Sequence, residues 1–267
     1  QEIRQKNIDI TDSMNYAREM QQTMLPSLKD IGTLLPESFI LFIPRDIIGV
    51  DLYWFTEKNG KAFVAACDCS AQGIPGAFIS MIGNNLLNQI IIENGIEDPA
   101  EVLKLFNTGF ESFFSKSDGS NSVNDPDTSV GTAQMEVALC VIDKKRKELQ
   151  FAGSRRPLYL IRNNSLQEIK GEIASTGGVD VNKHAFSTHK IKIKKNDMIY
   201  LSSDGYENQF GGPTVQRFLN KRLKDLLLDI QHLSIEEQYN RLKNTFEKWK
   251  GNRQQFDDVL MIGIRLK

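Results

Sequence analysis

The chain has 267 residues, of which 40% are hydrophobic and 25% charged, as is typical of a folded globular protein with one large domain or two small ones. Its formal net charge of −1 provides no overall positive field, so we expect no nucleic acid partner. The three cysteines lack the spacing with histidine that a zinc site needs. We therefore expect reduced thiols and a cytoplasmic location.

No run of residues reaches the roughly 18 to 20 apolar positions needed to cross a bilayer. The sequence starts at Gln1, inside a predicted helix and without an initiator methionine. We therefore expect a piece of a longer protein, in which a missing N-terminal region could provide a membrane anchor.

Residues 1–26 predict a helix that ends at Pro26. Apolar or small side chains recur every seven residues, at Ile3, Ile10, Ala17 and Met24. This heptad-like stripe needs a partner surface, either on a second copy of the chain or on the chain's own globular part. We assign residues 1–27 to a signalling and dimerisation helix, and expect a homodimer.

The rest of the chain predicts strands and helices in blocks. Strands are expected first at residues 39–43, 50–56 and 61–68, followed by helices at 76–93 and 99–115 and a loop at 116–133. Further strands are expected at 134–143, 148–152, 157–162, 166–170, 187–194 and 197–203. Helices at 215–231 and 235–249 precede a last strand at 257–265. Blocks of this kind, without strict alternation, predict an α+β fold with antiparallel sheets.

Several aspartates lie at the margins of these apolar strands. They are Asp51, Asp68, Asp204 and the pair Asp257 and Asp258. Carboxylates that meet in one cleft repel each other unless protons or cations neutralise them. Oxygen ligands without histidine or thiolate favour Mg²⁺ or Mn²⁺. Aspartate at a strand end is also common in ordinary turns, so the residues alone leave both interpretations open.

Five ordered segments add a family resemblance. They are PRDIIGVDLYWF, FVAACDCSAQGIPGAFISMIG, LYLIRNN, IYLSSDGYENQFGG and FDDVLMIGIRL. Together they resemble the SpoIIE/RsbU branch of the PPM metal-dependent serine/threonine protein phosphatases over residues 36–267. The resemblance implies a phosphatase domain at 36–267, built as a PPM-type sandwich of two antiparallel β-sheets flanked by α-helices. A coiled-coil-like linker helix would precede it.

The resemblance also implies a site. Catalytic roles would fall to Asp51, Asp68 and Asp204. Ligands for two Mn²⁺ or Mg²⁺ ions would be Asp51, Asp68, the backbone carbonyl of Cys69, Asp204 and Asp257. Metal-activated water would then hydrolyse phosphoserine or phosphothreonine on a signalling protein, expected to be a STAS-type anti-sigma-factor antagonist. A missing N-terminal sensor or receiver domain would regulate the reaction through the helix.

Some residues depart from the family pattern. Val50 stands where the family has glycine, and Ala71 and Gln72 stand where it has glycine and histidine. They keep open a second interpretation, a weak or inactive phosphatase-like module that binds a partner and relays a signal. A small-molecule phosphohydrolase is a third. Arg155 and Arg156 would either bind a substrate phosphate or form an exposed turn.

Overall fold

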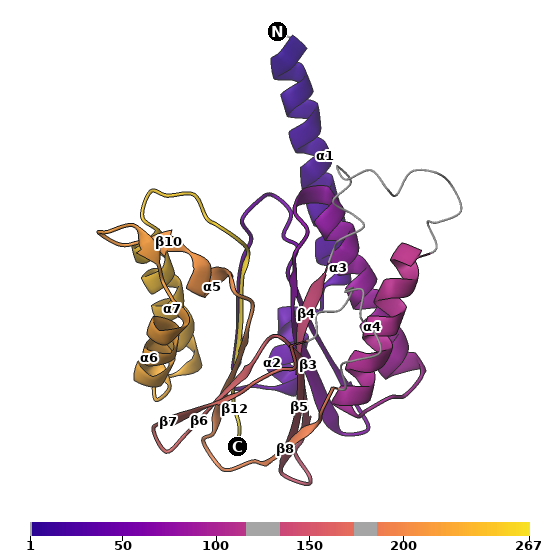
Figure 1. Cartoon of the computed structure of the whole chain (residues 1–267), viewed down its shortest axis with the longest axis vertical. Helices are drawn as coiled ribbons and strands as arrows, with labels where there is room; N and C mark the ends of the chain where they lie inside the picture. Colours follow the sequence, from indigo (N-terminus) through magenta and orange to yellow (C-terminus); the bar gives the residue numbers. More distant parts are fainter. Residues whose placement is uncertain (1, 116–133, 174–185) are drawn as a thin grey trace.

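The computed structural model describes residues 2–115, 134–173 and 186–267. Two five-stranded antiparallel sheets pack face to face, and helices cover the outer surface of each (Figure 1). This four-layer arrangement confirms the predicted α+β sandwich. Within the described ranges, every helix is too short or too polar to span a membrane.

The first sheet has the strand order β2-β3-β4-β5-β8. Its strands are β2 (Leu52–Lys58), β3 (Lys61–Cys69), β4 (Met135–Asp143), β5 (Glu148–Ser154) and β8 (His189–Lys192). Asn59 and Gly60 both take positive φ, which allows the tight turn between β2 and β3. The central strands β3 and β4 are almost wholly buried because both of their faces are covered.

The second sheet has the order β1-β12-β9-β6-β7. Its strands are β1 (Ser38–Ile43), β12 (Val259–Arg265), β9 (Met198–Ser202), β6 (Leu158–Arg162) and β7 (Ser165–Ile169). The last strand of the chain therefore lies between β1 and β9. Since β3 and β9 end where β2 and β12 begin, four strand termini meet at one end of the sandwich.

Three apolar clusters hold the layers together. One lies between the two sheets and includes Val64, Leu160 and Ile262. The second joins the first sheet to α3 (Gly73–Leu87), the π-helix η1 (Asn88–Glu93) and α4 (Pro99–Ser115). The third joins the second sheet to α6 (Asn220–Ile230) and α7 (Ile235–Lys250). Such burial of apolar side chains is the main stabilising contribution to the fold.

The N-terminal helix α1 (Glu2–Met24) extends away from the globular body (Figure 1). Ile3 and Ile10 on it are 78% and 54% exposed, so this part of the helix does not pack on the described sandwich. Its last turns do contact the body, where Gln21 is buried. The N-terminal part of the predicted heptad stripe is thus exposed and available to a partner, and the structure contains a single chain.

Some predicted boundaries were wrong for identifiable reasons. The helix expected at 215–231 begins only at Asn220, because Val215 and Leu219 take positive φ and Gln216–Arg217 (β11) pairs with Phe210–Gly211 (β10). Two short helices were not predicted, α2 (Leu28–Leu34) and α5 (Gly205–Asn208). The loop expected at 116–133 lies outside the described residues.

Candidate metal centre

The acidic residues predicted from the sequence meet at the end of the sandwich where the four strand termini gather. Asp51 immediately precedes β2, and Asp68 is the penultimate residue of β3. Asp204 follows β9 by two positions, and Asp257 precedes β12 by two. The backbone N–H of Asp204 donates to Asp68 Oδ2 at 3.0 Å, which ties the two sheets together at this point.

Asp51 is one of the two fully buried acids of the cluster, with 4% of its surface exposed against 3% for Asp258. Its Oδ1 accepts a long hydrogen bond from the backbone N–H of Cys69 at 3.4 Å, while its Oδ2 is buried without a hydrogen-bond partner. Burial raises the pKa of Asp51 well above its usual value, and repulsion from Asp68 and Asp258 raises it further, although the nearby Ser203 hydroxyl partly opposes the shift. An acceptor atom in this state is stable only when a proton or a cation reaches it.

Asp68 and Asp204 share a cationic neighbour. Arg156 Nη1 lies 3.6 Å from Asp68 Oδ2, and Nη2 lies 4.0 Å from Asp204 Oδ2. The Nε of Arg156 pairs with Glu136 Oε2 at 2.8 Å. Burial and repulsion from Asp204 still raise the pKa of Asp68 to about 7, although Arg156 opposes the shift. One guanidinium therefore does not neutralise the group.

The two consecutive aspartates near the C-terminus have different surroundings. Asp258 accepts hydrogen bonds from the backbone N–H groups of Arg45, Val50 and Asp51, at 2.7, 2.5 and 3.1 Å. Its carboxylate is thereby committed to shaping the loop that carries Asp51. Asp257 is free of such bonds to the loop. Burial and repulsion from Asp204 and Asp258 raise its pKa, although a backbone N–H bond from Asp258 lowers it.

The cysteine thiols are poor metal ligands here. Burial raises the pKa of Cys69 to about 12, and burial also raises the pKa of Cys67. Both thiols therefore stay protonated near neutral pH, whereas thiolate is the form that binds metals. Cys69 can contribute only its backbone carbonyl, as the resemblance implies.

The residues present fit a hydrated divalent cation. No three histidine, cysteine, aspartate or glutamate side chains of the described ranges form a ready-made protein cage for a metal. Mg²⁺ does not need one, since it usually keeps several water ligands and binds one or two carboxylates. The unsatisfied Asp51 Oδ2 and the raised pKa values of Asp51, Asp68 and Asp257 indicate missing positive charge.

The departures from the family pattern are accommodated without backbone strain. Neither Val50 nor Ala71 takes a positive φ, and the left-handed position falls on Gly73, with φ +62°. Val50 Cγ1 occupies the space where a side chain on Gly76 would project, so a glycine in α3 makes room for it. Gln72 Oε1 accepts a hydrogen bond from Arg45 at 3.2 Å.

The two arginines predicted as substrate ligands differ in position. The Arg156 side chain is only 14% exposed, so the exposed-turn interpretation is wrong for it. The Arg155 side chain is 46% exposed and lies 3.8 Å from Glu136. Sequence reasoning missed Glu136. It lies opposite Asp68 in the β3–β4 pair and forms an ion pair with Arg156, but nothing in the local sequence marks it as a residue of the site.

A cleft opens beside Asp257. It has a volume of about 540 Å³ and is lined mainly by polar side chains, including Arg45, Gln72 and Gln254. Phe210 and Phe256 form an edge-to-face aromatic pair at its wall. A polar cleft next to the acidic cluster is suitable for a charged group of a substrate chain.

Comparisons with known proteins identify the family and the fold. The model of the family described as Stage II sporulation protein E (SpoIIE) matches residues 58–267. The SiaA-PP2C domain of Pseudomonas aeruginosa is 27% identical, with a TM-score of 0.85 over 98% of this chain and 99% of that chain. Comparison with curated protein sequences gave no match.

Two more distant solved structures share the fold. The PP2C phosphatase domain of SpoIIE from Bacillus subtilis, with a fragment of its regulatory domain, is 16% identical, with a TM-score of 0.62 over 86% of this chain and 61% of that chain. The Mycobacterium tuberculosis serine/threonine phosphatase PstP is 12% identical, with a TM-score of 0.61 over 86% of this chain and 98% of that chain.

Proposed function

This chain belongs to the SpoIIE family of PP2C-type serine/threonine phosphatases, and from that premise we propose that its acidic cluster binds Mn²⁺ or Mg²⁺ and hydrolyses phosphoserine or phosphothreonine on a signalling protein. The observation that carries the proposal is the buried Asp51 Oδ2, which has no hydrogen-bond partner and lies among like charges. We assign the ligand positions to Asp51, Asp68, Asp204, Asp257 and the carbonyl of Cys69.

Bound divalent cations would supply a water of lowered pKa as nucleophile and would offset charge on the phosphoryl oxygens. The chain's own residues position the components. Asp258 fixes the Asp51 loop through three backbone N–H groups. Asp68 is held opposite Asp204 by the hydrogen bond from the Asp204 backbone.

Arg156 is the residue we assign to the substrate phosphate. Its Nε lies 2.8 Å from Glu136 Oε2 in an ion pair without hydrogen-bond geometry, and its two terminal nitrogens face Asp68 and Asp204. Once cations neutralise those carboxylates, the terminal nitrogens can donate to a phosphoryl oxygen instead. Arg155 is more exposed and would act on the rim. The 540 Å³ cleft beside Asp257 would hold the polypeptide flanking the phosphorylated residue.

We further propose that α1 carries regulation. The side chain of Gln21 contacts the loop that leads to Asp51, while the N-terminal turns of α1 expose apolar side chains. A homodimer formed through α1, attached to a missing sensor or receiver domain, would transmit its state through this contact. The family resemblance supports a STAS-type anti-sigma-factor antagonist as the substrate.

One observation favours a second candidate function. Arg156 already places a positive charge between Asp68 and Asp204, where a cation would bind. If this guanidinium prevents divalent cations from binding, the domain is a weak or inactive phosphatase-like module that binds a phosphoprotein without hydrolysing it.

Phosphate release from a phosphoserine peptide, measured with Mn²⁺ and with EDTA, separates the two. We expect Mn²⁺-dependent release that Asp68→Asn and Asp204→Asn each abolish, with Asp229→Asn, at an exposed position of α6 outside the acidic cluster and the cleft, as the matched control. Peptide binding without release in the unmodified chain would identify the inactive module instead. If the Asp68 and Asp204 variants released as much phosphate as the unmodified chain, that result would contradict the proposed reaction.

A further inference from the structure

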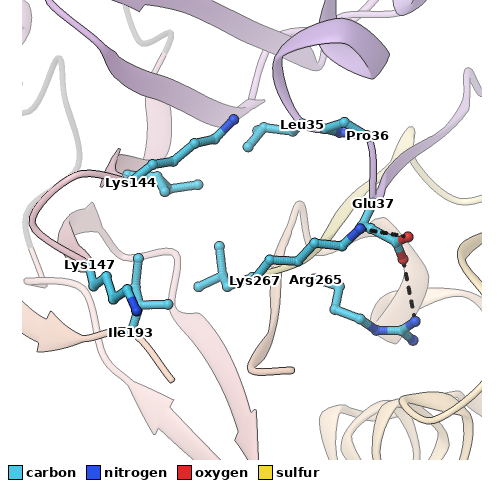
Figure 2. A pocket seen from close by; sticks show the side chains of 10 residues that line it. Leu35, Pro36, Glu37, Lys144, Lys147, Ile193, Arg265 and Lys267 are labelled. Atoms are coloured by element: carbon cyan, nitrogen blue, oxygen red, sulfur yellow. Dashed lines mark hydrogen bonds and ion pairs between the residues drawn. The ribbon is translucent and has the colours of Figure 1, made fainter. Parts of the chain in front are cut away.

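A second cavity lies at the opposite end of the sandwich from the acidic cluster. Strand β12 runs from the Asp257 end of the molecule to Arg265, and Arg265 lines this cavity (Figure 2). The cavity has a volume of about 320 Å³, at the lower end of the range of about 300 to 1,000 Å³ seen for small-molecule sites. The proposed phosphatase reaction has no use for it.

The walls of this distal pocket are apolar and come from both sheets. Ile142 belongs to β4 and Ile193 follows β8, while Leu35 and Leu266 flank β1 and β12. Each of the four side chains is less than 9% exposed although it borders the cavity. The pocket is therefore a gap between the two sheets, and a hydrocarbon group that entered it would lose its contact with water.

The rim of the distal pocket is positively charged. Four cationic side chains line it, Lys144, Lys147, Arg265 and Lys267, against a single acid, Glu37. The Glu37 carboxylate pairs with Arg265 Nη1 at 3.5 Å and with Lys267 Nζ at 3.4 Å (Figure 2). One carboxylate is thus shared by two cations.

The other two cations have no acidic partner in the described part of the chain. Lys144 Nζ donates to the carbonyl of Leu34 at 2.5 Å. This bond uses one N–H of the ammonium group, but a neutral carbonyl does not balance its positive charge. Lys147 has no ion pair with a described carboxylate. It is the last residue of the β4–β5 turn, where it takes a positive φ of 50°. Both ammonium groups can therefore serve an anionic ligand.

We propose that the distal pocket binds a small amphipathic anion, with a compact hydrocarbon body between Leu35, Ile142, Ile193 and Leu266 and a carboxylate or phosphate at the cationic rim, where Lys144 and Lys147 are the cations without an acidic partner. The volume restricts the body to a short acyl chain or a single aromatic group. The excess of positive charge at the rim excludes a cationic ligand and disfavours a neutral one.

Octanoate is a suitable probe, since it combines an eight-carbon body with one carboxylate. Calorimetry on the full chain should show octanoate binding at a single site, with octanol binding at least tenfold more weakly because it lacks the charge. Acetate, which keeps the charge and lacks the body, should not bind measurably. Equal binding of octanol, or no binding of octanoate, would overturn the proposal.

Two variants test the residues. Lys144→Gln combined with Lys147→Asn should weaken octanoate binding about tenfold, equivalent to about 1.4 kcal/mol, because both unpaired rim charges are removed. Asparagine tolerates the positive φ at position 147. Glu37→Gln should tighten binding several-fold, because it removes the one acid of the lining and leaves the Lys267 ammonium without a carboxylate partner.

The matched control is Lys145→Gln, in the same turn but outside the pocket lining. It should leave octanoate affinity unchanged. An equal loss with Lys145→Gln would assign the effect to the general charge of the turn, as an anionic membrane or an acidic protein would use it, and would overturn the pocket. Thermal melting of each variant confirms that it is folded before its affinity is compared.

Discussion

The side-chain amide of Gln21, near the end of α1, donates a hydrogen bond of 2.7 Å to the backbone carbonyl of Gly49. The bond is buried, and it joins the projecting helix to the loop that ends at Asp51. The Gln21 side chain therefore links the position of α1 to the position of Asp51, and this link can be tested.

Replacing Gln21 with methionine should lower Mn²⁺-dependent phosphatase activity several-fold. Methionine keeps the volume but leaves the buried Gly49 carbonyl without a donor, at a cost of about 1 to 3 kcal/mol. Gln22→Met, on the exposed neighbouring position, is the control and should behave as the unmodified chain does. Steady-state kinetics at several Mn²⁺ concentrations provide the measurement. Unchanged activity in the Gln21 variant would argue against regulation through this contact.

Replacing Asp51 with asparagine should stabilise the metal-free chain while abolishing its response to Mn²⁺. The substitution removes a carboxyl group whose ionisation the folded state opposes, because burial and the neighbouring aspartates raise its pKa. We expect a gain on the order of 1 kcal/mol, or about 2 to 4 °C in melting temperature for a chain of this size. Differential scanning fluorimetry with EDTA and with Mn²⁺ measures both effects.

Asp197→Asn is the matched comparison for that experiment. Asp197 is also buried, but it pairs with Arg162 at 2.6 Å and accepts the Lys194 backbone N–H at 2.7 Å. Its loss should cost about 1 to 3 kcal/mol, because the partly exposed Arg162 guanidinium and the Lys194 N–H both lose a charged acceptor. A fall in melting temperature for Asp51→Asn in EDTA would show that Asp51 is a structural carboxylate.

The metal-free chain should lose stability as pH rises from about 4 to about 7. Burial, together with repulsion from Asp204, raises the pKa of Asp68 to about 7 from an unfolded value near 3.9. The folded state therefore favours the protonated carboxyl, and the stability that this group contributes below pH 4 is lost as pH rises through the folded pKa. Melting temperatures in EDTA across pH 5 to 8 should fall, and Asp68→Asn should flatten the slope. An equal slope in that variant would assign the effect to other groups.

Replacing Arg156 with glutamine should separate metal binding from substrate binding. Without the guanidinium between Asp68 and Asp204, Mn²⁺ should bind several-fold more tightly, since a competing cation has been removed. The KM for a phosphopeptide should rise about tenfold, because a charged donor to phosphate is lost. Arg155→Gln, at the more exposed neighbour, should alter both values much less. Weaker metal binding in the Arg156 variant would contradict this assignment.

The exposed stripe of α1 predicts a dimer in solution. Ile3 and Ile10 are exposed and lie seven residues apart, as expected for a helix pair. Replacing both with glutamate should convert the dimer to a monomer in sedimentation velocity, without changing the melting temperature of the sandwich. Glutamate at Gln5 and Tyr16, exposed on the opposite side of α1, provides a charge-matched control. Identical sedimentation of the two variants would rule out association through this stripe.

The sequence predicted most of the strands because their apolar runs are long and their turns are marked by glycine, asparagine or lysine. It also placed Asp51, Asp68, Asp204 and Asp257 at strand margins, which the antiparallel pairing brings to one end. The short helix α2 escaped prediction because its seven residues carry little periodicity beyond the Ser27 cap.

Other features depend on tertiary contacts that local sequence does not encode. The delayed start of α6 follows from the positive φ of Val215 and Leu219, which neither residue favours on its own. Arg156 is buried only because Asp68, Glu136 and Asp204 surround it from three other segments. Asp257 and Asp258 are adjacent and chemically identical, so the sequence does not show that Asp258 binds the loop N–H groups while Asp257 does not.

The three backbone N–H groups gathered by Asp258 imply that the loop is already in its final shape before any cofactor arrives. Ion uptake then needs dehydration and charge matching but no ordering of the polypeptide, so the entropy of fixing this loop is lost during folding and not during loading. Exchange of one divalent ion for another should accordingly be rapid and should leave the backbone unmoved.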